Sequence, residues 1–539
     1  MARSHDRILL ASVVALGVVH AWRYTGHVSD DAYISFRYAH RLASGSGLTW
    51  NDGDGVEGYS DLLWVLLVAA GDAVGLDPVL TARALGLLGL TVAIGLVARG
   101  GVPRALSGGL ILAACGGLAA WAVGGLEHAA LAGLVTAFVV GARQGWRGVD
   151  LLALPITWMR ADGLVLALAA GGIARRPRAL LLAGAAAVAQ LAFRLLVHGD
   201  AVPNTARVKV SLTLGRAFQG LEWVAEALAD NGVLVAAGLI GAVWAPRARP
   251  AVAIAGVWCA YVALVGGDTF YGYRQLVPVL PLFALAWADG VEDRAPRPWI
   301  GPLAAGLYAV SHLGGVAVTT LALPGWAQAS REPARMLRAA YAPQEPLLAV
   351  DAAGVLPYTT GFPAVDMLGL NDRWLATHPP SDWGGSAGIG HDLGDGAYLA
   401  SRKPDIVAFC SALGSPTPCF RSGREWVELP DWQLYAPVCL GWPEGVARYF
   451  LRTDGPLGVR VGEDALVVPA VLLSSIGAPA VLAGDALVVG LGAGGSVAAW
   501  PTGPGWTLAT DGLRREGDRL VADRPLELRE VRYVRASPP

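Results

Sequence analysis

Long apolar runs separated by short loops constrain the fold of this chain more than any other feature. They lie at about residues 8–24, 79–98, 105–123, 127–142, 148–174, 179–197, 232–246, 250–266, 275–290 and 299–322. Only 16% of the residues are charged, against about a quarter in soluble domains. Because backbone polar groups in lipid must be satisfied within their own segment, the runs predict an α-helical polytopic membrane bundle.

Arginines in the short loops predict the orientation of this bundle. Arg3 and Arg7 precede the first run, and later basic loops contain Arg99 and Arg104, Arg143 and Arg147, Arg175, Arg176 and Arg178, Arg247 and Arg249, and Arg294 and Arg297. The positive-inside rule places these loops in the cytoplasm. No small-residue cleavage site follows the first run before an acidic motif, so we interpret the run as a retained anchor. The net charge of −2 argues against nucleic acid as a partner.

Two segments must deviate from simple spans to satisfy this orientation. Residues 62–77 are short and contain Asp72, so we expect an interfacial helix on the outer face. Residues 148–174 lie between two basic loops and must cross the membrane twice, with a break at MRADG. The total is about eleven transmembrane helices, an odd number, which places the C-terminus outside the plasma membrane.

The pattern of apolar and polar residues changes near residue 325. Apolar runs shorten, and DALVVGLGA, GWTLATDGL and LELREVRYVRA alternate like strands between turns. We therefore expect a transmembrane domain at 1–324 and an extracytoplasmic α/β or β-rich domain at 325–539. Cys410 and Cys419 are then a plausible disulfide pair, the alternative being reduced, buried thiols.

Two adjacent acids, Asp30 and Asp31, lie where the first helix leaves the membrane, and Glu57 follows in the same loop. Acids at a membrane boundary are costly and usually serve chemistry or ion binding. On the predicted topology, further polar residues gather at this outer face: Arg37, Arg160, Asp162, Asn204, Arg207, Lys209, Asp268, Tyr273, Arg274, His391, Asp392 and Asp395. Such convergence of distant segments is what a binding site requires.

The outer face has no ATP or nucleotide sugar, so an activated group must arrive on a lipid. Arg160, Lys209, Arg274 and Arg37 are candidates to bind a lipid phosphate. Asp30 or Asp31 is the candidate general base for an acceptor hydroxyl. Glu57, Asn204, Asp268, Tyr273 and His391 are candidate substrate-binding residues. The paired acids also suit a divalent cation, Mg²⁺ or Ca²⁺.

Each of these residues also has a structural interpretation. One of the two aspartates caps the following helix, which leaves the other unexplained. Arginines near the interface extend toward the headgroups, and oppositely charged neighbours form local ion pairs. These interpretations apply to Arg37 as a snorkelling residue, Glu57 as a turn cap, Arg160 paired with Asp162, Arg207 and Lys209 as juxtamembrane cations, Arg274 paired with Asp268, and His391 as a structural histidine.

The chain resembles bacterial GT-C glycosyltransferases, above all in the run DDAYISFRYAHRLASGSGLTWNDGDGVEGYSDLLW, which is similar to their first outer loop. The nearest group is that of the actinobacterial terminal arabinofuranosyltransferases. WMRADG looks like the family's Arg-Pro-Glu/Asp-Gly element, and the similarity extends through VPNTARVKV, GGDTFYGYR, DAAGVLPYTTGFPAVDMLGLNDRWLA and GIGHDLGDGAYLASRKPDIV.

The resemblance implies inverting transfer of a sugar, arabinofuranose or a hexose, from a polyprenyl-phosphate donor to an envelope glycan, lipid or protein. The family's catalytic acid maps onto Asp30 or Asp31, and its phosphate-binding cations onto Arg160, Lys209 and Arg274. Two alternatives belong to other classes. A transporter would have polar residues on both faces and inverted repeats. A non-catalytic protein of envelope or motor assembly would be expected to lose the paired acids.

Overall fold

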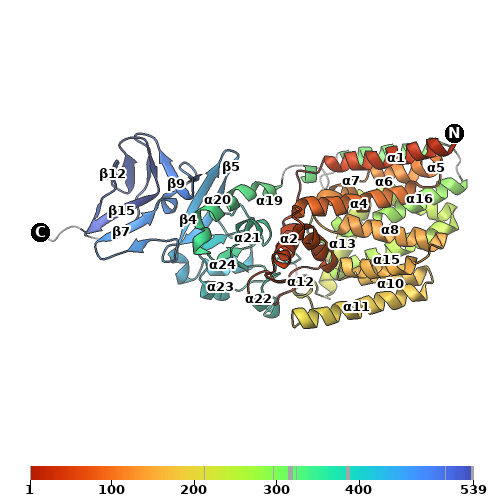
Figure 1. Ribbon diagram of the computed structural model, residues 1–539, viewed down its shortest axis with the longest axis horizontal. Helices are drawn as coiled ribbons and strands as arrows, with labels where there is room; N and C mark the ends of the chain where they lie inside the picture. Colours follow the sequence, from red (N-terminus) through yellow and green to blue (C-terminus); the bar gives the residue numbers. More distant parts are fainter. Residues whose placement is uncertain are drawn as a thin grey trace. The chain divides into compact units, whose positions relative to one another are not determined.

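The computed structural model describes residues 2–211, 213–294, 297–313, 320–322, 325–383, 389–503 and 505–535. The described chain divides into two compact units (Figure 1). The first contains residues 1–325 together with 382–390, and the second contains 326–381 and 391–539. The sequence predicts a domain boundary between residues 324 and 325. Residues 323 and 324 lie outside the described ranges.

The first unit is helical. Its longer helices are α1 (Ala2–Trp22), α2 (Asp30–Ala43), α3 (Leu62–Ala73), α4 (Pro78–Ala98), α8 (His128–Gln144), α10 (Gly163–Ile173), α11 (Pro177–Val197), α13 (Leu214–Asp230), α14 (Gly232–Trp244), α15 (Arg249–Val265), α16 (Leu280–Arg294) and α17 (Ile300–Leu313). Shorter pieces are α5 (Val102–Arg104), a π-helical turn (Ala105–Gly109), α6 (Leu110–Ala113), α7 (Gly116–Val123), a 3-10 turn (Val149–Leu152), α9 (Ala153–Met159) and α12 (Asn204–Lys209). Residues 314–319 of the last expected span lie outside the described residues.

Small residues allow these helices to pack closely. A Cβ atom on Gly89 of α4 would collide with the carbonyl oxygen of Ala129 on α8, and one on Gly241 of α14 would collide with that of Ala286 on α16. In lipid, where apolar side chains gain little by leaving the solvent, such close backbone contact is a main source of helix association. Gly89 and Gly241 therefore allow α4 to pack closely against α8 and α14 against α16.

The expected number of about eleven spans is not confirmed. Among the described residues, four helices are long and apolar enough to cross a membrane, or up to six if each of two bent pairs counts as one span. Expected run 105–123 is bent by 62° between α6 and α7, and α13 meets α14 at 85°. The predicted break at MRADG is confirmed, because α9 ends at Met159 and α10 begins at Gly163.

The second unit begins with α19 (Trp326–Ala329) and α20 (Arg331–Tyr341) and contains three sheets. The largest sheet has the strand order β14-β9-β8-β4-β5-β3-β1-β2. Its strands are β1 (Leu348–Val350), β2 (Ala364–Asp366), β3 (Ile406–Ala408), β4 (Tyr435–Trp442), β5 (Gly445–Arg452), β8 (Ala480–Ala483), β9 (Ala486–Leu491) and β14 (Leu526–Leu528). β1 pairs in parallel with both β2 and β3, and β4 forms an antiparallel hairpin with β5.

Short helices follow or connect the parallel strands: α21 (Val355–Thr360), α22 (Arg373–Thr377), α23 (Gly396–Arg402) and α24 (Arg421–Trp426). The two smaller sheets contain β10 (Ser496–Ala498), β12 (Leu513–Glu516) and β13 (Arg519–Ala522), and β6 (Arg460–Val461), β7 (Ala465–Pro469), β11 (Trp506–Leu508) and β15 (Glu530–Arg535). The expectation of a β-rich C-terminal region is confirmed, and strands form in each of the three segments predicted to contain them.

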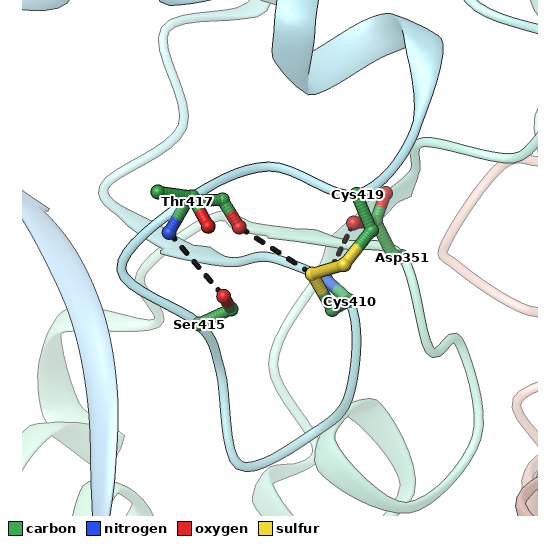
Figure 2. Close-up of a disulfide and its surroundings, with 5 residues drawn as sticks. All are labelled: Asp351, Cys410, Ser415, Thr417 and Cys419. Carbon is green, nitrogen blue, oxygen red and sulfur yellow. Dashed lines mark hydrogen bonds between the residues drawn. A yellow bond between two sulfur atoms is a disulfide. The ribbon is translucent and has the colours of Figure 1, made fainter.

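One disulfide closes a loop of this unit (Figure 2). Cys410 and Cys419, nine positions apart, are bonded with their Cα atoms 5.3 Å apart, which confirms the predicted pairing. The backbone N–H of Cys410 donates to the Asp351 carboxylate at 2.6 Å. Burial raises the pKa of Asp351 to about 7, an effect that the Cys410 N–H opposes and the neighbouring Asp366 carboxylate reinforces.

Candidate active site

The site forms around Asp31, in the first turn of α2. Ser29 occupies the N-cap position of α2, so the helix begins at Asp30 itself. The backbone N–H of Ser29 donates to the carbonyl oxygen of Gly124. Asp30 is buried, with 8% of its surface exposed, whereas the Asp31 side chain is 23% exposed. Two cations approach the same oxygen of Asp31: Arg274 Nη1 lies 3.4 Å and Lys209 Nζ 3.6 Å from Oδ2.

Arg274 is held in place from two other sides. Its Nε donates to Asp268 Oδ2 at 2.6 Å and its Nη2 to Asp268 Oδ1 at 3.3 Å. Its guanidinium lies over the ring of Phe270, 3.7 Å from the centroid, which is cation–π geometry. Tyr273 precedes it in the left-handed region with φ of 49° and packs edge-on against Trp223. The local ion pair considered from the sequence thus exists, and Arg274 reaches Asp31 as well.

Lys209 is the last residue of the short helix α12. The backbone N–H of Asn204, at the start of α12, donates to the carbonyl oxygen of Glu57, which ties this helix to the first loop. Gly390 lies against the Lys209 side chain, because a Cβ atom at Gly390 would be 3.3 Å from Lys209 Cγ. Three separate parts of the chain, α2, α12 and the loop of residues 268–274, therefore meet at Asp31.

Arg160 lies at the break between α9 and α10 and is surrounded by acceptors. Nη1 contacts Glu127 Oε1 at 2.6 Å and His128 Nε2 at 3.1 Å. Nε and Nη2 bind the two oxygens of Asp162 at 2.7 and 3.0 Å. Because arginine can only donate, Nε2 of His128 must be the acceptor, which places the ring proton on Nδ1.

The break is also attached to the first loop. The backbone N–H of Ala161 donates to Ser60 at 2.8 Å. Next to it, Ser35 of α2 donates to the carboxylate of Asp61 at 2.9 Å. Burial, with the nearby Glu127, raises the pKa of Asp61. Trp121 contacts both groups: its ring centroid lies 5.8 Å from that of His128 and 5.7 Å from the Arg274 guanidinium, so the network lies beside the Asp31 cluster.

Other predicted site residues have different partners. Glu57 accepts from Arg194 Nε at 2.7 Å, and burial raises the pKa of Glu57 to about 6 despite this cation. Arg37 donates to the carbonyl oxygen of Trp50 at 2.7 Å and lies over the Trp50 ring. His391 belongs to the second unit, where it stacks on Phe420 with ring centroids 5.0 Å apart.

Four residues of this region were not predicted from the sequence: Asp61, Glu127, His128 and Arg194. Glu127 and His128 open an apolar run shortly after Gly124 and Gly125, and an acid in that position carries the same boundary signal that singled out Asp30 and Asp31. Arg194 lies in the last turn of an expected span. Within the described ranges, no group of three or more His, Cys, Asp or Glu side chains is arranged to hold a metal ion.

Three solved structures are similar to this chain, two of them with TM-scores above 0.5. ArnT from Cupriavidus metallidurans in the apo state matches with a TM-score of 0.55 and 14% identity, over 83% of this chain and 98% of that chain. ArnT bound to undecaprenyl phosphate matches with a TM-score of 0.51 and 14% identity, over 68% and 86% of the two chains. Arabinofuranosyltransferase AftD from Mycobacteria matches with a TM-score of 0.37 and 14% identity, over 86% of this chain and 41% of that chain.

Sequence comparison adds one family. Residues 322–452 match a domain of unknown function, DUF8728. No curated protein sequence matches the chain. The similarity to the two ArnT structures, which extends over most of both chains, shows that this chain shares their fold.

Proposed function

We propose that the chain is an integral membrane glycosyltransferase that takes a sugar from a polyprenyl-phosphate donor. The observation that carries this proposal is the convergence of Lys209 and Arg274 on Asp31. Two groups that can bind an anion lie next to a carboxylate, with Arg274 Nη1 3.4 Å and Lys209 Nζ 3.6 Å from Asp31 Oδ2. The structure of ArnT bound to undecaprenyl phosphate supports a prenyl-linked phosphate as the ligand of this fold. The acceptor is a glycan, lipid or protein of the cell envelope.

In this mechanism Arg274 and Lys209 bind the donor phosphate. A guanidinium can meet two phosphate oxygens at once, and lysine adds a second positive charge. Both cations stabilise the negative charge that grows on the phosphate as the sugar leaves. Arg160 already bonds to two carboxylates, and Arg37 bonds to the loop backbone, so we assign both arginines to positioning that region.

Asp31 acts as the general base. The acceptor hydroxyl oxygen forms a bond to the anomeric carbon while the bond from that carbon to the phosphate oxygen breaks. The electron pair of the broken bond stays on the phosphate, and the hydroxyl proton passes to the Asp31 carboxylate and then to water. A single displacement of this kind inverts the anomeric configuration. Asp31 is favoured over Asp30 because its side chain is the more exposed and meets the cations.

A complementation experiment tests this function. Envelope glycans and lipid-linked sugars are measured by mass spectrometry in cells that lack the protein and in cells that express a variant. We expect wild type to restore a missing glycan and Asp31→Asn to leave its lipid-linked precursor accumulated. Asp52→Asn is the matched control, because it removes the same charge from the same loop at a side chain that is 92% exposed. Unchanged glycans without the protein, or full restoration by Asp31→Asn, would refute the proposal.

A further inference from the structure

We propose that Asp31 is the resting counterion of Lys209 and Arg274, and that the donor phosphate takes its place before the acceptor reacts. This inference rests on the proposed function, and it adds an order of events to it. Donor binding would release the base from its cations, so the carboxylate would become available only when a sugar is present to be transferred.

The distances separate one fixed contact from two exchangeable ones. Ionic N–H···O contacts are typically about 2.7–2.9 Å long. The contact between Arg274 Nε and Asp268, at 2.6 Å, is of this strong kind. The contacts of Asp31 with Arg274 and Lys209, at 3.4 and 3.6 Å, are longer. An incoming anion therefore has the weaker contacts to replace.

The two cations have compensating negative charges both before and after the exchange. In the resting site Lys209 and Arg274 carry two positive charges, and Asp31 and Asp268 carry two negative charges. The released Asp31 carboxylate remains as one negative charge without these cations, at a side chain that is 23% exposed. A prenyl phosphosugar is a phosphodiester with one negative charge, so it replaces Asp31 as the counterion without leaving an uncompensated cation. Avoiding such a charge matters because the Arg274 side chain is only 6% exposed, where an unpaired ion is costly.

The cations can remain in place while their counterion changes. Asp268 and Phe270 hold the Arg274 guanidinium on the sides away from Nη1, the nitrogen that faces Asp31. The Lys209 side chain is 32% exposed and has a flexible stem, so its ammonium can follow the phosphate. Asp31 is part of a helix turn and cannot follow far, so its carboxylate is left facing the site.

Binding of undecaprenyl phosphate to the purified full-length protein in detergent tests the exchange. If Asp31 competes with phosphate, Asp31→Asn binds the lipid about fivefold more tightly than wild type, a factor typical of one partly exposed ion pair. Lys209→Met binds it more weakly, because a phosphate ligand is lost. Asp52→Asn controls for the general gain in positive charge and is expected to match wild type. Inorganic phosphate is titrated in parallel to separate the headgroup contribution from that of the prenyl chain.

The outcomes distinguish this inference from the function on which it rests. Equal or weaker binding by Asp31→Asn overturns the exchange while leaving the cation site intact, provided that Lys209→Met still weakens binding. Equal tightening by Asp52→Asn also overturns it, since the effect would then be general electrostatics. If wild type, Asp31→Asn and Lys209→Met all bind equally, the proposed phosphate site itself is wrong.

Discussion

Replacing Arg160 by Met should be among the most destabilising single changes in the first unit. The guanidinium is bonded to the buried carboxylate of Glu127 and to the half-buried one of Asp162, whose side chains are 2% and 16% exposed. Methionine fills a similar volume but carries no charge. The substitution therefore leaves two neighbouring carboxylates without their shared cation, and Asp61, another buried acid, lies close to Glu127.

The magnitude follows from the buried ion pairs that the substitution breaks. Removing one partner of a buried ion pair costs about 3–5 kcal/mol, because the remaining charge stays desolvated. Replacing Glu127 by Gln is milder. The amide oxygen still accepts from Arg160 Nη1, and Asp162 still neutralises the cation, so we expect the loss of one charge-assisted bond, about 1–2 kcal/mol.

A double-mutant cycle makes the argument testable. Glu127→Gln should be destabilising in the wild-type background but neutral or stabilising in the Arg160→Met background, where the Glu127 charge has lost its partner. A coupling energy of about 1–3 kcal/mol is expected. The apparent midpoint of thermal unfolding is measured for the full chain in detergent at one scan rate, with Asp52→Asn as a control. Additive effects of the two substitutions, or an Arg160→Met protein as stable as wild type, would refute the reasoning.

Three further predictions concern single sites. The pKa of Asp351 is about 7 in the folded chain and about 4 in the unfolded chain, so its contribution to stability is present below pH 4 and lost as the pH rises toward 7. Asp351→Asn should remove this loss and gain at most ~4 kcal/mol at pH 8 but little at pH 4. Unfolding midpoints measured at both pH values check this prediction. Removing the disulfide by serine substitution of both cysteines, nine positions apart, should cost ~2.6 kcal/mol, and an unchanged midpoint would contradict this. Gly390→Ala should weaken undecaprenyl phosphate binding because its Cβ would press on Lys209, whereas Gly361→Ala, with a similar positive φ of 77° but open space, should not.

Composition along the chain was enough to predict most of the helices. Each expected apolar run contains helix, because in lipid the helix is the conformation that satisfies a single segment's backbone. Helix α13 was missed because Arg216, Glu222 and Glu226 interrupt its run of apolar residues, and the length of such runs was the criterion. The number of crossings could not be predicted in the same way. Helices that break and bend by 62° or 85° divide apolar runs into pieces shorter than a membrane is thick.

The acidic motif of the first loop was recognisable in the sequence, but the partners of its residues were not. Glu57 pairs with Arg194, which lies 137 positions away, and Arg160 pairs with Glu127, 33 positions away. Sequence analysis selects residues whose burial would be costly. It cannot select which opposite charge compensates each one, because that depends on the packing of helices far apart in the chain.

The ion pairs in the structure distinguish Arg160 from Arg274, two arginines that looked equivalent in the sequence. A phosphate binds best to a cation whose existing contacts are few or long, since those contacts must be given up or shared. Arg160 has carboxylates on both sides at 2.6–2.7 Å. Arg274 has one carboxylate at 2.6 Å and one at 3.4 Å, and Lys209 approaches Asp31 at 3.6 Å. Arg274→Met should weaken lipid-phosphate binding but also lower the unfolding midpoint, because it leaves the Asp268 carboxylate, on a side chain only 8% exposed, without its cation. If the ranking is correct, Lys209→Met should weaken binding at little cost in folding, whereas Arg160→Met should lower the unfolding midpoint first. The opposite pattern would transfer the phosphate site to the helix break.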